Sequence, residues 1–98
     1  MLWCFNEGFK MTLKLPNIEK NSNNVFSQFG EDGILNTILS GMRDCGISLN
    51  SWCVEFGAWD GIHHSNSFNL ISSFSWKAVL IEGDNKRFME LQKKCKCL

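Results

Sequence analysis

The chain has 98 residues, of which 44% are hydrophobic and 20% charged, and its ten acidic and ten basic side chains balance to zero net charge. This length allows one small domain, and the composition is that of a folded globular chain rather than a disordered one. The charge balance argues against a nucleic-acid-binding protein, which needs an excess of basic residues facing phosphates. We therefore expect no nucleic-acid partner.

The sequence also lacks the signals of a membrane or secreted protein. No apolar run approaches the roughly 18 residues of a membrane-spanning helix, and the apolar start at residues 2–5 is too short for a signal peptide. We expect a cytoplasmic protein with no membrane partner. The five cysteines are odd in number and irregularly spaced, unlike a disulfide framework. Cys95 and Cys97 could form half of a metal site, but no second pair completes it, so no metal is predicted.

Residues 1–24 show no convincing hydrophobic period, and we interpret them as a loosely ordered lead-in with a short extended piece at 11–15. Residues 25–46 instead predict a helix, because apolar side chains at 34, 35, 38, 39 and 42 share one face. Acidic residues at 31 and 32 and Arg43 suit its two ends, and Gly46 can cap it. This segment is either a covering helix or, at residues 27–33, a lid beside a pocket.

Two apolar strands follow, each leading into a helix. The first, Trp52 to Phe56, is apolar except at Glu55, which is the pattern of a strand covered on both faces. The second covers residues 78–82. Connections this short between strand, helix, strand and helix predict a right-handed crossover unit of a parallel sheet.

The two helices have recognisable starts. Ser65 or Asn66 can cap the first, and Asp84 or Asn85 the second. The buried positions of the first are predicted to be Phe68, Ile71 and Phe74. The second contains Phe88, Met89 and Leu91, and its lysines at 93, 94 and 96 lie at the favourable end of the helix dipole.

The end of the first strand carries the functional signal, in the stretch Val54-Glu55-Phe56-Gly57-Ala58-Trp59-Asp60-Gly61. A strand that ends in a carboxylate and two glycines is a common way to open a nucleotide-type pocket. Gly57 can adopt backbone angles closed to other residues, and Gly61 lets the next helix pack closely. Glu82 ends the second strand, where an α/β fold places a carboxylate that holds ribose hydroxyls.

Four blocks in order, at residues 27–35, 54–61, 63–66 and 80–84, resemble the N-terminal half of an FkbM-type methyltransferase. These are Rossmann-like enzymes that depend on S-adenosyl-L-methionine (SAM). The resemblance covers residues 25–94. It implies an α/β chain carrying part of the Rossmann-like SAM-methyltransferase fold: the first two parallel strands with flanking helices, preceded by an N-terminal helix. Residues 1–24 would be the lead-in and 25–98 the N-terminal part of the domain.

The resemblance also implies the site. The loop with Glu55, Gly57 and Gly61 would line the methionine half of SAM, and Glu82 would accept hydrogen bonds from both ribose hydroxyls. The cofactor-binding residues implied in full are Glu55, Gly57, Ala58, Trp59, Asp60, Gly61, Glu82, Gly83 and Asp84. Further strands and the acceptor-binding region of the family are absent from the sequence, which points to a fragment. The methyl acceptor, a small molecule or a glycan, stays unidentified.

The chemistry of the turn favours SAM over a dinucleotide. A pyrophosphate site needs bare backbone amides in the G-x-G-x-x-G spacing, whereas this turn carries Trp59 and the carboxylate of Asp60. A carboxylate repels phosphate and attracts the ammonium and sulfonium of SAM, and Trp59 can either face a cation or serve in packing. A nicotinamide-dependent oxidoreductase is therefore disfavoured. A general base, if one is needed, could be His63 or His64, but family enzymes place it on later strands.

Two alternatives stay open. The chain is an incomplete methyltransferase that carries the SAM-binding half, or a non-catalytic remnant that serves as a small binding module. In either case residues 52–56 would form a strand with one unpaired edge, and such an edge is a template for association. We expect the chain to self-associate through it.

Overall fold

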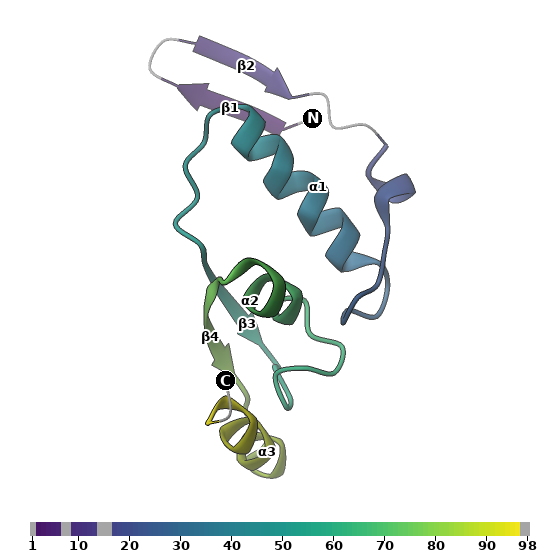
Figure 1. The fold of residues 1–98 in the computed structure, drawn as a ribbon, viewed down its shortest axis with the longest axis vertical. Helices are drawn as coiled ribbons and strands as arrows, with labels where there is room; N and C mark the ends of the chain where they lie inside the picture. Colours follow the sequence, from purple (N-terminus) through teal and green to yellow (C-terminus); the bar gives the residue numbers. More distant parts are fainter. Residues whose placement is uncertain (1, 7–8, 14–16, 97–98) are drawn as a thin grey trace. The chain divides into compact units, whose positions relative to one another are not determined.

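The computed structural model describes residues 2–6, 9–13 and 17–96. Within them it is an α/β protein with three α-helices and a two-stranded parallel sheet, in agreement with a partial βαβ unit. The chain divides into two compact units (Figure 1). The first contains the residues up to 24 together with 29–50, and the second contains 25–28 together with the residues from 51 onward.

The first unit begins with an antiparallel hairpin of β1 (Leu2–Asn6) and β2 (Phe9–Leu13), followed by a 3₁₀-helix at Ile18–Asn21. The prediction of a loosely ordered lead-in is therefore wrong for these segments. Residues 11–13 of the predicted extended piece belong to β2, and residues 14 and 15 lie outside the described residues. The hairpin was not predicted because β1 is a short, largely apolar run without alternation, and because β2 alternates over only five residues.

Helix α1 (Glu31–Asp44) completes the first unit. Its acidic first turn, with Glu31 and Asp32, and the basic residue of its last turn, Arg43, are confirmed, and the helix occupies this part of the predicted segment 25–46. Gly30 precedes it with a φ of 90°, and Gly46 ends it with a φ of 79°, donating its N–H to the carbonyl of Arg43. Both are conformations that favour glycine. The lid hypothesis concerns residues of both units and stays a prediction.

The second unit contains β3 (Trp52–Phe56), α2 (Phe68–Phe74), β4 (Lys77–Ile81) and α3 (Asn85–Cys95). Strands β3 and β4 are parallel, with Trp52 opposite Lys77 and Phe56 opposite Ile81. The prediction of two parallel strands joined by a helix is confirmed. The second strand lies one residue earlier than predicted, so Glu82 follows the strand instead of ending it.

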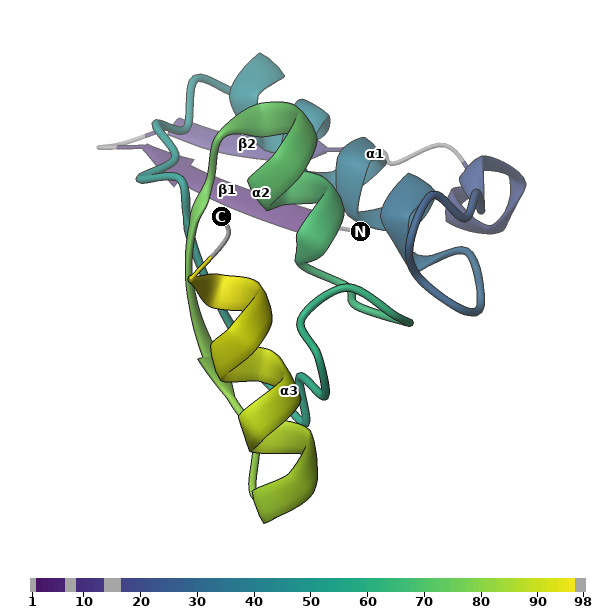
Figure 2. The same cartoon turned by 60° about the horizontal axis from the view of Figure 1, so that its bottom comes forward.

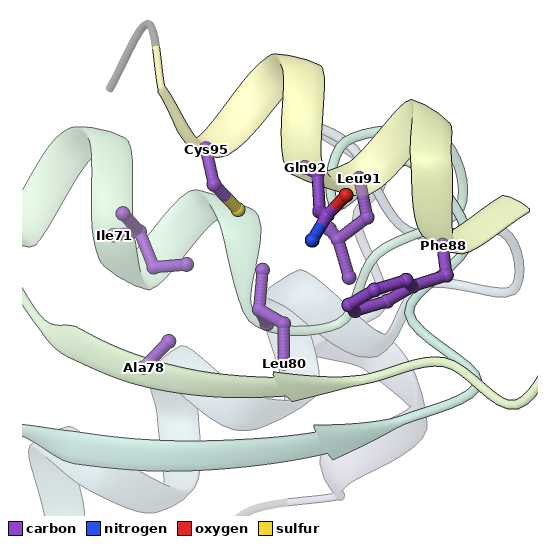
Figure 3. A pocket seen from close by; sticks show the side chains of 7 residues that line it. All are labelled: Ile71, Ala78, Leu80, Phe88, Leu91, Gln92 and Cys95. Carbon is purple, nitrogen blue, oxygen red and sulfur yellow. The ribbon is translucent and has the colours of Figure 1, made fainter.

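Helices α2 and α3 lie on the same face of this small sheet (Figures 2 and 3). Ala78 and Leu80 point from β4 toward them, and Leu91 of α3 is only 3% exposed between them. The opposite face carries large apolar side chains that are 41–77% exposed, so the prediction of a strand covered on both faces is wrong. Phe74 also departs from its predicted burial, because α2 is short and this residue is its last.

Among the helices that the structure describes, none combines the length and the apolar character needed to cross a bilayer.

Candidate functional site

The predicted site residues gather where β3 and β4 end. Because Phe56 and Ile81 are register partners, Gly57 and Glu82 leave the sheet side by side. The Ala58 N–H donates to the carbonyl of Ile81 at 3.1 Å, and the Trp59 N–H donates to Glu82 Oε2 at 2.8 Å. The glycine turn after β3 is thus fastened to the residues that follow β4.

The two glycines of the turn are needed for different reasons. Both have a positive φ, 68° at Gly57 and 79° at Gly61, which is a strained conformation for other residues. A Cβ on Gly61 would lie 2.9 Å from Leu91 Cδ1 and 3.1 Å from Leu80 Cδ1, so this glycine allows close packing against β4 and α3. A Cβ on Gly57 would meet nothing within 4 Å. The turn is therefore packed on its Gly61 side and open at Gly57.

The Glu82 carboxylate lies at this opening and is ionised. It accepts the Asp84 N–H at Oε1, 2.9 Å away, and the Trp59 N–H at Oε2. These two backbone donors, that of Asp84 first, hold the pKa of Glu82 below its ordinary value. A carboxylate has about four lone-pair sites, more than its backbone donors fill, so acceptor capacity remains for hydroxyl groups of a ligand. Beside it, Gly83 leaves open space where a side chain would stand.

Glu55, the other predicted acidic residue, serves the chain itself. Its Oε2 accepts the hydroxyls of Ser65 and Ser67 at 2.7 and 2.5 Å, and its Oε1 accepts the Asn66 N–H at 2.8 Å. The carboxylate therefore anchors the segment that starts α2 to the end of β3. Glu55 therefore influences the candidate site indirectly, because it fixes the loop that follows the turn.

Ser65 is the centre of this network. It is 2% exposed, and its Oγ accepts the N–H groups of Phe68 at 2.9 Å and Ser67 at 3.2 Å while donating to Glu55. The prediction that Ser65 serves the helix start is supported by the bond to Phe68, although Ser67 is the N-cap residue. The pairing with Glu55 was missed, since nothing in the sequence ties a serine to an acid ten residues before it.

Asp60 holds the loop together from within. It is 5% exposed, and Oδ1 accepts the N–H groups of Ile62 and His63 at 3.0 and 2.9 Å. The His63 ring nitrogen Nδ1 lies 2.6 Å from Oδ2. Burial acts against the charge, but the His63 ring and the two backbone donors outweigh it and lower the pKa of Asp60 to about 2. Its carboxylate is thus turned inward, and the prediction that it lines a cofactor site stays a prediction.

Trp59 already has a cation on its ring. The guanidinium carbon of Arg87 lies 5.3 Å from the ring centroid, and the indole N–H donates to Glu90 Oε2 at 3.0 Å. Both partners come from α3 and are spaced by three residues, so they share one helix face. The contacts of Arg87 and Glu90 with Trp59 were not predicted. The signal in the sequence was that both residues follow the predicted cap Asp84 and are three residues apart, which places them on one face of the helix. Trp59 thus ties the turn to α3.

Asp84 is confirmed as the cap of α3. Its Oδ1 accepts the Arg87 N–H at 2.9 Å, which satisfies one of the donors at the helix start. This use does not by itself remove it from the cofactor residues predicted from the family resemblance.

A cavity of about 300 Å³ lies away from the strand ends, between α2, β4 and α3 (Figure 3). None of the predicted cofactor-binding residues lines it. Its lining is apolar apart from an amide and a thiol, and consists of Ile71, Ala78, Leu80, Phe88, Leu91, Gln92 and Cys95.

Comparison of the chain with family models, with curated proteins and with solved structures gives no match. Within the described residues, no group of three or more His, Cys, Asp or Glu side chains is placed to hold a metal ion.

Proposed function

We propose that this chain is the SAM-binding half of an FkbM-like, SAM-dependent methyltransferase. The observation that carries the proposal is the Glu82 carboxylate, which accepts the Trp59 N–H of the glycine turn at the ends of two adjacent parallel strands. Crevices at the carboxyl ends of strands are where ligands bind in such sheets. The family resemblance of the same residues then favours SAM among nucleoside ligands.

The residues present fit this ligand. Glu82 has acceptor capacity beyond its backbone donors, and the ribose hydroxyls would use it. Its charge also opposes a phosphate at this place and favours a ligand that carries a positive charge. Glu55 and Ser65 act indirectly, by fixing the loop after the turn. When bound, SAM supplies an electrophilic methyl group, and this chain contributes its binding and orientation, from which much of the rate of an in-line displacement arises.

A non-catalytic binding module is the second candidate. It is favoured by the use of the loop carboxylates inside the chain: Glu55 binds the start of α2, and Asp60 binds His63. These groups stabilise a pocket and take no part in proton transfer from an acceptor. On this alternative the chain binds the nucleoside and performs no chemistry.

Isothermal titration of the full chain with SAM tests the proposal. Glu82→Ala should weaken binding roughly 10- to 100-fold, because two hydrogen bonds to a charged acceptor are lost. Glu19→Ala is the matched control, since it removes an exposed acidic side chain of the other unit and leaves the glycine turn and Glu82 in place. Absence of SAM binding by the wild type, or equal loss in both variants, would refute the assignment.

Methyl transfer then separates the two candidates. Transfer of a labelled methyl group from SAM to small molecules or glycans of a cell extract supports the enzyme. Binding of SAM that depends on Glu82, without any transfer, supports the binding module.

A further inference from the structure

The face of the β3–β4 sheet that α2 and α3 leave uncovered is apolar across both strands. Alternate residues of the two strands point to it, and their side chains are exposed to an unusual degree for large apolar groups. We call them the apolar face; they are Trp52 (51%), Val54 (58%), Phe56 (77%), Val79 (46%) and Ile81 (41%). Lys77 is the one charged residue in this alternation, and its ammonium lies 5.5 Å from the Trp52 ring centroid.

Such a face requires a cover. Parallel strands are almost always buried on both faces, because each face of the sheet is apolar. Single exposed apolar residues are ordinary, but a continuous patch marks a surface for association. The five residues of the apolar face carry no charge, and Lys77 lies at its border beside Trp52, so the surface that covers the face needs to be apolar.

We propose that the apolar face is the interface of a symmetric homodimer, in which two copies of the chain pack their β3–β4 sheets against each other. A two-fold axis brings the same patch of both copies together, so an apolar patch finds an apolar partner by symmetry. Aligned sheets pack about 10 Å apart with strand directions within about 30°. Two copies of the β3–β4 sheet can pack in this way.

The area of the apolar face agrees with a second copy of the chain as its cover. Aromatic side chains present on the order of 150–250 Å² and aliphatic ones somewhat less, so the exposed fractions of these five residues leave roughly 500 Å² of apolar face per copy. Two copies would remove roughly 1,000 Å² from water, which is at the lower limit of specific protein interfaces. The dimer should therefore be weak and dissociate on dilution. This inference does not depend on the proposed function.

Sedimentation velocity of the full chain over a range of concentrations tests the proposal. Wild-type protein should pass from monomer to dimer as the concentration rises. Val54→Lys places a charge in the middle of the apolar face and should raise the dissociation constant more than about tenfold. Met89→Lys is the matched control: Met89 is 54% exposed on α3, away from this face, and its variant should dimerise like the wild type.

A second variant protects the test against a folding defect. Phe56→Ser alters the most exposed residue of the face and should also weaken the dimer, with unchanged amide exchange in α2 and α3. A wild type that stays monomeric throughout would overturn the proposal and mean that another part of the chain or another protein covers the face. Equal dimerisation of Val54→Lys and Met89→Lys, or large polydisperse assemblies of the wild type, would overturn it as well.

Discussion

Removal of one buried hydroxyl, in Ser65→Ala, should loosen the loop that connects the glycine turn to α2. The variant deletes the bond from Ser65 Oγ to Glu55 Oε2 and leaves the Phe68 N–H at the start of the helix without its acceptor. A bond to a charged acceptor contributes about 1.5–3 kcal/mol, and the lower value applies because Glu55 is half-buried and keeps two other donors. Loss of a helix cap adds about 1 kcal/mol. We expect a total loss of about 2–3 kcal/mol.

Amide hydrogen exchange is the suitable assay, because it reports on α2 separately from the other unit of the chain. A loss of this size speeds exchange at Phe68 by roughly 30- to 150-fold. Ser73→Ala is the control: Ser73 is an exposed serine of the same helix, and its loss should change little. Exchange at Phe68 that is no faster in Ser65→Ala than in Ser73→Ala would refute the view that Ser65 ties the helix to Glu55.

Three further outcomes concern the two turn glycines, Asp60 and Gly33, each measured by urea or acid unfolding. Gly57→Ala, with open space around it, should lose about 1–2 kcal/mol of backbone strain, whereas Gly61→Ala should lose about 2–5 kcal/mol, because overpacking of about 1–3 kcal/mol adds to the same strain. Asp60 has a folded pKa of about 2 against an ordinary 3.8, so the stability that it contributes is complete above pH 4 and is lost as the pH falls through 2. Asp60→Asn should lack this pH-dependent loss of stability in acid unfolding. Gly33→Ala would set a Cβ 1.9 Å from the Asn21 carbonyl oxygen and should displace the 3₁₀-helix from the start of α1.

Each of these outcomes has a clear contradiction. Equal losses at both turn glycines would mean that Gly61 is not packed as described. An unchanged acid midpoint in Asp60→Asn would remove this carboxylate from the acid-sensitive groups. A Gly33→Ala variant as stable as the wild type would show that the contact between Gly33 and Asn21 is not close.

The sequence predicted elements whose signal is local. The strand at Trp52–Phe56 and the ends of α1 were recovered because apolar runs, helix-end charges and Gly46 act within a few residues. The exposure of the apolar face could not be recovered, since an apolar run looks the same whether one face or two are covered. The burial of Phe74 was predicted wrongly for a related reason: helical spacing identifies a face, but it does not reveal where a short helix ends.

In the candidate site, too, some features could be predicted from the sequence and others depend on the fold. Glu55, Gly57, Gly61 and Glu82 were found by type and spacing, and the structure brings them to the ends of neighbouring strands. What each carboxylate binds was beyond the sequence. The partner of Glu55 is ten residues away and that of Glu82 is 23 residues away, so both pairings depend on how the chain folds back.

The bond between Trp59 and Glu82 has a consequence for the order in which the chain acquires its structure. The residues that close the glycine turn follow it by 23 positions at Glu82 and by 31 at Glu90. During synthesis, the strand β3 and its turn therefore leave the ribosome before their fastening groups have emerged. The turn can adopt its final shape only after β4 and most of α3 have been translated. Until then the nascent chain presents the apolar strand β3 without its pairing partner, which is the interval in which a chaperone would be of most use.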